Sequence, residues 1–346
     1  MNSILKEDLQ DIINSSLINW KKLRNKTILI TGATGLIGSI LTKALIIKNS
    51  TDNLNLNMVL LIRKKEEAEK IFGKNKYISY IVSSVEEYIP RNTKIDYIIH
   101  GASPTKSKFF VNNPVETMDI SILGTKRILE QARISKIKSA VYLSSMEMYG
   151  NMDSVNVEEK DQGFINPLKE RSSYSQSKRT CELYSYCYYK EYEVPIKIAR
   201  IAQTFGAGVS KKENRVYKIF ADAILNETDI ILKSEGSTII NFSYTTDTVI
   251  GILYILLNGK DGEAYNLVSD ETNMTILESA KWLANKYGNG KVNVKIEIPK
   301  ENAGFAPNNK MILSNKKLKN IGWNYKYNLK QGYERLLLYL KEENKK

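Results

Sequence analysis

The stretch KTILITGATGLIGS, residues 26–39, decides the fold. A β-branched apolar run enters a turn in which Gly32, Gly35 and Gly38 lie three residues apart, and a helical pattern follows. The first glycine allows a tight turn, the second lets backbone approach a pyrophosphate, and the third lets helix and strand pack closely. The pyrophosphate would lie on the amide groups at the helix N-terminus. This strand–turn–helix context predicts a dinucleotide site.

Short apolar runs alternate with helical patterns from residue 26 to residue 201. The alternation predicts parallel βαβ units, in which a helix crosses from one strand to the next. Further strands are predicted at NMVLLIR (57–63), KYISYIVSS (76–84), IDYIIHGAS (95–103), SAVYLSS (139–145) and VPIKIARI (194–201). Six such strands make an α/β fold with a Rossmann-type doubly wound parallel sheet.

The pattern becomes less regular after residue 202. Helices are predicted at 215–227, 275–288 and 329–343, and a strand followed by a helix that returns to the core at 240–259. We predict a smaller C-terminal α/β cap over the strand ends, where ligands bind in such folds. The predicted division is an N-terminal helical extension (1–21), a dinucleotide-binding domain (22–202 plus 236–258) and a substrate cap (203–235 plus 259–346).

Composition excludes several classes of chemistry. One His and two Cys leave no cluster for a metal ion and no spare imidazole for a Ser-His-Asp triad, so no metal is expected. The net charge of +13 is spread along the chain among acids, which favours a solvated surface over binding to nucleic acid or to a membrane. The first residues read as an amphipathic helix and no run reaches membrane-spanning length, so a cytoplasmic location is expected.

The end of the second predicted strand bears on the choice of cofactor. An acid there would hold the ribose hydroxyls of NAD, whereas LLIRKK (60–65) offers Arg63 and Lys64, which suit a 2′-phosphate. These cations favour NADP over NAD, and the alternative is that they are ordinary surface charges. The other predicted cofactor contacts are Thr34, Leu36 and Ile37 with the three glycines, Gly101, Ala102 and Ser103 at the end of the fourth strand, Ser144 at the end of the fifth, and Tyr174 and Lys178.

The stretch RSSYSQSKRTCE (171–182) places Tyr174 and Lys178 one helical turn apart on one face. The same spacing recurs at Tyr186 with Lys190 and at 287 with 291, so spacing alone decides nothing. Only the first pair follows a strand that ends in a hydroxyl residue, Ser145. A nearby ammonium and a positive nicotinamide favour the phenolate, so this tyrosine can act as a base despite its ordinary pKa of about 10.

Taken together, TGxxGxxG, the SS before MEMYG, and YxxxK resemble the extended short-chain dehydrogenase/reductase family, the NAD(P)-dependent nucleotide-sugar epimerases and dehydratases. The resemblance covers roughly residues 25 to 290 and includes ARIAQTFGAG and FSYTTD. It implies that Tyr174 takes the proton of the sugar 4-hydroxyl while C4 is oxidised, that Ser145 hydrogen-bonds the reacting oxygen, and that Lys178 also binds the cofactor ribose. The implied partner is a nucleotide-diphosphate sugar, and the implied assembly is a homodimer through the helix of Tyr174.

Glu147 matches the glutamate with which family dehydratases abstract the C5 proton next to the new ketone. The resemblance therefore favours a 4,6-dehydratase or an epimerase. The alternative is a purely structural role, in which this glutamate caps a loop or pairs with a lysine. Met146 stands where several dehydratases have an acid or hydroxyl residue, so Glu147 itself would have to protonate the leaving 6-hydroxyl.

Other positions depart from the family pattern. The arginine usual before FSYTTD is Ile240, which argues against a uronic-acid decarboxylase and leaves Arg215, with Val216 beside it, as the predicted diphosphate clamp. Gln203 replaces the usual substrate-side asparagine. His100 is expected to be structural. The alternatives are an NADPH-dependent 4-ketoreductase of a 4-keto-6-deoxy nucleotide sugar and a dinucleotide-sensing protein without turnover.

Overall fold

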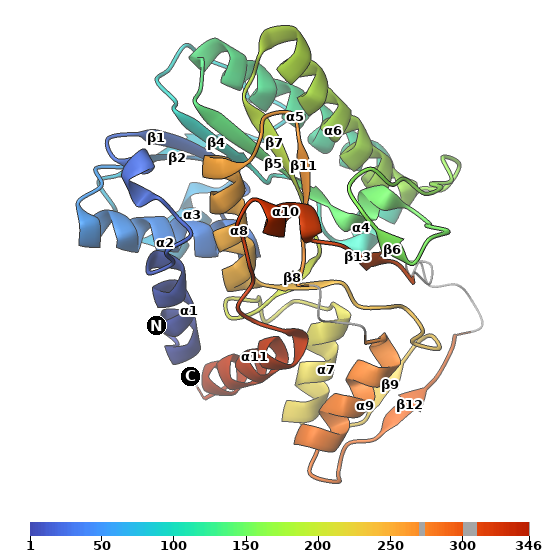
Figure 1. The fold of residues 1–346 in the computed structure, drawn as a ribbon. Helices are drawn as coiled ribbons and strands as arrows, with labels where there is room; N and C mark the ends of the chain where they lie inside the picture. Colours follow the sequence, from blue (N-terminus) through green and yellow to red (C-terminus); the bar gives the residue numbers. More distant parts are fainter. Residues whose placement is uncertain (270–273, 300–309, 346) are drawn as a thin grey trace.

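A computed structural model describes residues 1–269, 274–299 and 310–345 (Figure 1). Within these residues, seven parallel strands form one sheet in the order β11-β7-β5-β4-β1-β2-β3. The predicted Rossmann-type doubly wound sheet is therefore confirmed. The strands are β1 (Thr27–Thr31), β2 (Asn57–Ile62), β3 (Ile78–Val82), β4 (Tyr97–His100), β5 (Ser139–Ser145), β7 (Ile196–Ile201) and β11 (Ala264–Leu267).

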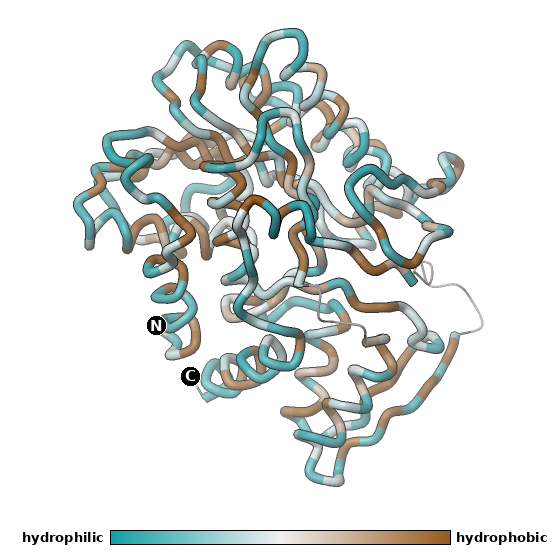
Figure 2. The backbone as a smooth tube through the Cα atoms, in the orientation of Figure 1, coloured by the Kyte–Doolittle hydropathy of each residue, from teal (hydrophilic) through white to brown (hydrophobic). Residues whose placement is uncertain are grey.

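Helices cover both faces of the sheet because its strands are apolar on both sides. Ile28 and Ile30 of β1 pack into the core cluster shared with α2 (Leu36–Asp52) and α8 (Thr245–Asn258). Leu29 points to the other face, toward α5 (Pro114–Ser135) and α6 (Ser172–Tyr192). These β1 side chains are essentially fully buried, and each such aliphatic residue contributes roughly 1.5–3 kcal/mol relative to exposure. Figure 2 shows the hydrophobic backbone segments gathered in the central strands.

The sequence prediction missed one strand of the sheet. Residues 264–267 were assigned to the cap, but β11 pairs in parallel with β7 from Ala264↔Ile198 to Leu267↔Ile201. The strand has only four residues and includes the polar Asn266, so its apolar pattern is too short to distinguish it from a loop. The segment therefore belongs to the main sheet, although the predicted division includes it in the cap.

The smaller C-terminal layer contains α7 (Val216–Leu225), α9 (Ile276–Tyr287) and a parallel pair of short strands, β9 (Ile230–Leu232) and β12 (Val294–Ile296). A second pair joins β8 (Gln203–Phe205) to β10 (Phe242–Tyr244), and a third joins β6 (Asn156–Val157) to β13 (Ile312–Leu313). Helix α9 begins with a capping box between Thr275 and Glu278, which satisfies backbone amides that the helix leaves open. This layer lies below the carboxyl ends of the main strands in Figure 1.

The predicted N-terminal amphipathic helix is confirmed as α1 (Ser3–Ile13), and it packs on α2, α8 and the last helix, α11 (Leu329–Glu343). Arg335 of α11 donates to the buried carboxylate of Asp8 at 2.6 Å, and Tyr244 donates to the same group at 2.8 Å. The two ends of the chain therefore lie together beside the sheet, as Figure 1 shows.

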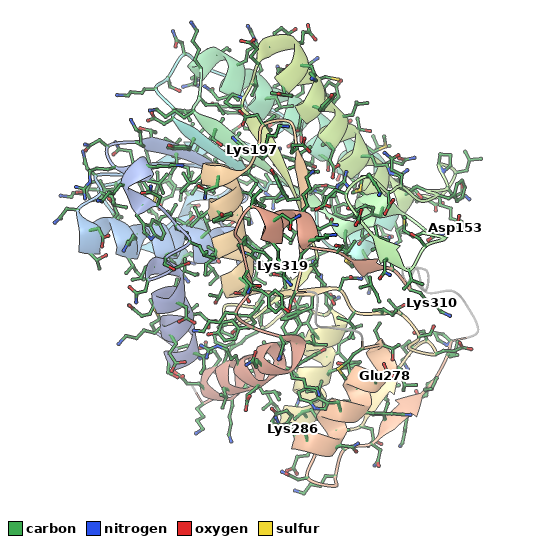
Figure 3. All side chains as sticks on the ribbon, viewed as in Figure 1. Asp153, Lys197, Glu278, Lys286, Lys310 and Lys319 are labelled. Carbon is green, nitrogen blue, oxygen red and sulfur yellow. The ribbon has the colours of Figure 1, made fainter. Side chains whose placement is uncertain are left out.

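Charged side chains surround the fold on the view of Figure 3. The labelled Lys286, Lys310 and Lys319 lie on separate parts of the molecule, and the labelled acids Asp153 and Glu278 lie among them. At these positions the basic excess is dispersed, as the sequence predicts. Among the residues that the structure describes, no helix is both long and apolar enough to cross a membrane.

Candidate active site

The glycine turn connects β1 to α2 in the predicted conformation. Gly32 has φ +73°, a left-handed value that favours glycine, and a Cβ there would lie 2.8 Å from the backbone of Gly101. A Cβ at Gly38 would collide with the carbonyl oxygen of Gly32. The first and third glycines are therefore required by the backbone itself. Gly35 is the N-cap of α2 and is exposed.

The residues predicted to contact the cofactor lie at one edge of the sheet. Strands β2, β1, β4 and β5 are neighbours, and their carboxyl ends bring Arg63, the glycine turn, the segment 101–103 and Ser144 into one row. The Thr31 hydroxyl accepts from the amides of Gly101 and Ala102 at 3.1 and 3.0 Å, which joins the turn to the end of β4. Arg63 is exposed at the end of β2.

This edge fits a dinucleotide. No side chain of the described residues caps the first turn of α2, and that turn contains no acid, so its amide groups are left for an anion. In the glycine turn beside them, a Cβ at Gly32 or Gly38 would occupy the space that glycine leaves free. Such amides suit a pyrophosphate. Gly32, Gly35 and Gly38 with Thr34, Leu36 and Ile37 would hold that group. When bound, the cofactor supplies the ability to accept and return a hydride.

His100 lies at the end of β4 and is fully buried. Its Nδ1 is 2.7 Å from the Thr31 hydroxyl and its Nε2 is 3.1 Å from that of Thr125. Burial lowers its pKa to about 3, and Lys178 adds to the effect. The imidazole is therefore neutral and joins two hydroxyl groups, in agreement with the structural role expected for it.

Ser145, Tyr174 and Lys178 lie together where β5 meets α6. Ser145 is the last residue of β5. Its hydroxyl accepts from the amide of Glu147 at 3.2 Å and lies close enough to Tyr174 to lower the pKa of that phenol. Tyr174 lies in the first turn of α6. The Lys178 ammonium donates to the carbonyl of Leu143 at 2.9 Å and lies 5.6 Å from the centroid of the Tyr174 ring. The structure thus brings together the predicted dyad and its serine.

The electrostatics of the dyad differ from the expectation. Burial raises the pKa of Tyr174 above its ordinary value, and the Glu147 carboxylate raises it further, whereas the Ser145 hydrogen bond, Arg215 and Arg171 lower it. Burial also lowers the pKa of Lys178, to about 8. Without cofactor, the site therefore favours the phenol over the phenolate, because desolvation outweighs the nearby positive charges.

Phe110 is a site residue that the sequence did not reveal. It lies on α4 (Ser107–Asn112), is 2% exposed, and stacks on Tyr174 with ring centroids 4.2 Å apart and planes inclined by 6°. The Ser173 hydroxyl also donates to the Phe110 carbonyl at 3.3 Å. The stacked ring excludes water from one face of the tyrosine.

Arg171, also missed, pairs with Glu147. Its guanidinium donates to both carboxylate oxygens, at 2.9 and 3.2 Å, from the residue that precedes α6. The structural alternative for Glu147 in the sequence analysis is a pairing with a basic residue, but it names lysine instead of arginine. The Nε of Arg171 is buried and has no hydrogen-bond partner among the described residues. Position 171 lies three residues before Tyr174, the spacing of one helical turn, which is the signal that could have revealed it.

The predicted substrate residues follow the ends of β5 and β7 or begin α7. Met146 follows Ser145 and packs with an apolar cluster that contains Met148 and Tyr149. Gln203 begins β8 and is partly exposed. Arg215 precedes α7, pairs with Glu213 at 2.9 Å and donates to the Thr105 carbonyl at 2.9 Å. Val216 is the first residue of α7.

A parallel sheet with a glycine turn at one strand end and a Ser–Tyr–Lys set at another defines a class, the α/β enzymes that use a dinucleotide for oxidation and reduction. The described residues contain no group of His, Cys, Asp and Glu side chains that could hold a metal ion.

The particular family follows from comparison with known proteins. The chain belongs to the NAD dependent epimerase/dehydratase family, whose model matches residues 28–267. UDP-glucuronic acid decarboxylase 3 of Arabidopsis thaliana is 28% identical over 89% of this chain and 87% of its own. UDP-glucuronic acid decarboxylase 1 of Danio rerio is 30% identical over 74% of this chain and 59% of its own.

Solved structures share the fold at lower identity. The epimerase Mth375 of Methanothermobacter thermautotrophicus has a TM-score of 0.79 and 22% identity, over 96% of this chain and 97% of that one. DesIV, a dTDP-glucose 4,6-dehydratase of Streptomyces venezuelae with NAD and TYD bound, has a TM-score of 0.76 and 19% identity, over 92% and 98%. The chain is thus an enzyme of this family, and the shared fold covers most of its length.

Proposed function

We propose that the protein oxidises a nucleotide-diphosphate sugar at C4 with bound NAD or NADP, and then uses Glu147 at C5. The observation that carries the proposal is the convergence of Glu147, Ser145 and Tyr174, since the serine hydroxyl contacts both the tyrosine and the amide of the glutamate. Tyr174 takes the proton of the 4-hydroxyl, and Ser145 holds the oxygen as its charge develops. Lys178 supplies positive charge beneath the tyrosine.

The second step depends on the acidity of C5. A ketone at C4 makes the neighbouring C–H acidic, and Glu147, which pairs with Arg171, takes that proton. Loss of the 6-hydroxyl as water, with its proton from Glu147, followed by return of the hydride to C6 and of a proton to C5, would complete a 4,6-dehydratase. Return of the proton to the other face of C5 and of the hydride to C4 would complete an epimerase. We favour the dehydratase. Arg215 is the proposed clamp for the diphosphate, because its guanidinium suits phosphate oxygens and lies near Tyr174.

A uronic-acid decarboxylase is the second candidate. The curated relatives named above are UDP-glucuronic acid decarboxylases, and Arg171 offers a guanidinium with a free Nε–H beside Glu147, where a C6 carboxylate would lie. Against it, the position two residues before FSYTTD is the buried Ile240 instead of arginine.

The experiment incubates the purified protein with nucleotide-linked hexoses and hexuronic acids, without added reductant, and reads product masses. Loss of one water supports the dehydratase, loss of carbon dioxide the decarboxylase, and an unchanged mass with a changed configuration the epimerase. Turnover only with 4-keto sugars and stoichiometric NADPH would instead identify a 4-ketoreductase and contradict the proposal.

A further inference from the structure

The four predicted catalytic residues lie on three different elements. Ser145 ends β5, Glu147 lies in the 3₁₀ helix η2 (Met146–Tyr149), and Tyr174 and Lys178 lie on α6. A reaction that uses Tyr174 at one carbon and Glu147 at the next requires these elements to keep one relative position. A misplacement of about 1 Å can cost roughly 100-fold in rate.

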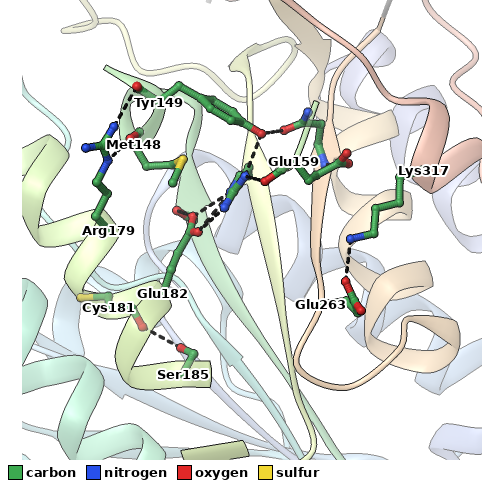
Figure 4. Close-up of polar contacts among 12 residues, drawn as sticks. Met148, Tyr149, Glu159, Arg179, Cys181, Glu182, Ser185, Glu263 and Lys317 are labelled. Carbon is green, nitrogen blue, oxygen red and sulfur yellow. Dashed lines mark hydrogen bonds and ion pairs between the residues drawn. The ribbon is translucent and has the colours of Figure 1, made fainter. Parts of the chain in front are cut away.

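A chain of buried hydrogen bonds joins these same elements (Figure 4). Ser144 of β5 donates to Glu182 of α6 at 2.5 Å, and Arg200 of β7 pairs with Glu182 at 2.7 Å. Arg200 also donates to the hydroxyl of Tyr149 in η2 at 2.9 Å. That hydroxyl donates in turn to Asn266 of β11 at 2.7 Å. Ser144 directly precedes Ser145 and Glu182 lies one turn after Lys178, so the chain begins beside catalytic residues.

A second set of contacts fixes η2 to α6 from the other side. Arg179, the residue after Lys178, donates to the carbonyls of Met148 at 2.6 Å and Tyr149 at 2.9 Å (Figure 4). Both carbonyls follow Glu147 directly along η2. The backbone of the short helix therefore has few ways to move without breaking a bond to α6.

Stability does not explain the buried charges. Glu182 and Arg200 are each 7% exposed, and replacing such an ion pair by packed apolar residues is often neutral or stabilising. Charged groups of this kind can instead select one arrangement of the elements that hold them. The arrangement selected here is the one that sets η2 against β5 and α6.

We propose that Tyr149 and Arg200 are positioning residues that keep Glu147 in register with Tyr174, so that the step at C5 follows oxidation at C4. Neither touches the reacting atoms; Arg200 fixes the Tyr149 hydroxyl, and Tyr149 fixes the end of the helix that presents Glu147. The inference rests on the proposed function, since it assigns a role within that two-step reaction.

Tyr149→Phe tests the inference because it removes a single hydroxyl from a fully buried ring. The variant and the wild type are mixed with the accepted nucleotide sugar in heavy water. The absorbance of reduced nicotinamide reports oxidation at C4, and deuterium in the sugar reports proton exchange at C5. We expect the first signal to stay within about two-fold and the second to fall roughly 10- to 100-fold. Tyr88→Phe is the matched control: it removes the hydroxyl that bonds Gln131 and should change neither signal.

Equal falls in both signals, or no change in either, would overturn the positioning role. Arg200→Lys gives a second route if Tyr149→Phe does not fold, because lysine keeps the charge but loses the fork that reaches both Glu182 and Tyr149. Arg200→Lys should likewise leave oxidation at C4 within about two-fold, and it should lower proton exchange at C5 more than Tyr149→Phe does. If the wild type itself gives neither signal with any sugar, the proposed function fails and the inference fails with it. If the wild type gives both signals, the variants test the positioning role alone.

Discussion

Burial and the Glu147 carboxylate both raise the pKa of Tyr174, while the guanidinium groups of Arg215 and Arg171 oppose them. A cofactor whose nicotinamide carries positive charge would add to the opposing side. The same charge disappears when the ring accepts a hydride. The tyrosine is therefore expected to lose its proton most readily in the complex with oxidised cofactor, which couples proton removal to oxidation at C4.

Tyr174→Phe removes the proposed base while keeping the stacked ring against Phe110. We expect turnover to fall about 10²- to 10⁴-fold, the usual contribution of a general base, with the melting temperature nearly unchanged. Tyr186→Phe is the control, because it disrupts the other Tyr–Lys pair on the same helix, and it should retain activity. A Tyr174→Phe enzyme as active as the wild type would rule out the assigned role.

Arg63 determines the choice between NADP and NAD if it contacts a 2′-phosphate. Arg63→Ser should then weaken NADP binding by about 10- to 100-fold, the effect of losing one hydrogen bond to a charged group, and leave NAD binding within about two-fold. Titration calorimetry with both cofactors measures the ratio. An equal effect on the two cofactors, or none, would show that Arg63 is an ordinary surface cation.

Single residues were predictable where a local motif carries them. Ser145, Tyr174 and Lys178 follow from a strand end and one helical turn, and the structure places them together. Phe110 and Arg200 were not assigned to the site, because their partners lie far away in the chain and only the packing of α4 and β7 brings them together. Contacts between distant segments leave no periodicity in a single sequence.

Elements were predictable where their apolar pattern is long. The strands β1, β2, β3, β4, β5 and β7 and the helices α7, α9 and α11 fall within their predicted ranges. The four-residue β11 was not predicted, because its pairing with β7 defines it as a strand and its own sequence is too short to show an apolar pattern. The predicted sheet therefore ends at β7 and lacks the edge strand β11.

Asp247, in the first turn of α8, makes stability depend on pH. It accepts from the amides of Lys326 and Tyr327, both at 2.9 Å, and burial raises its pKa to about 7, with Asp11 adding to the rise. The folded pKa lies above the unfolded value of about 3.9, so the protonated group favours the folded state. Its contribution is complete below about pH 4 and is lost as pH rises through 7.

Asp247→Asn removes this titration. The free energy of unfolding of the wild type minus that of the variant should therefore decrease between pH 4 and pH 8, by up to about 4 kcal/mol. Urea unfolding of both proteins across this range measures it. A difference that stays constant, or that increases with pH, would show that the carboxyl group is not shifted upward in the folded protein.

At the scale of the whole molecule, the outer surface of α5 and α6 is unusually apolar for exposed helices. Leu183 on α6 is 62% exposed, and Leu123 and Met118 on α5 are 46% and 41% exposed. The two helices pack on each other and leave these side chains outward. A second copy of the pair would cover them in a four-helix interface, as the expected homodimer requires.

Light scattering coupled to gel filtration should give a mass near twice 39.5 kDa for the wild type. Leu183→Glu would place a charge in the interface and should give the mass of one chain with an unchanged melting transition at low concentration. Leu338→Glu, at an exposed position on α11, is the control and should remain a dimer. A wild type of one-chain mass would contradict the homodimer.

The measurement that tests the central claim most directly compares the wild type, Glu147→Gln and Tyr174→Phe with one accepted nucleotide sugar in heavy water. We expect the wild type to give a product of altered mass or configuration that carries deuterium at C5. Glu147→Gln should form reduced nicotinamide but no deuterated product, and Tyr174→Phe should form neither. A Glu147→Gln enzyme that still yields the deuterated product at the wild-type rate would contradict the two-step reaction proposed for this site.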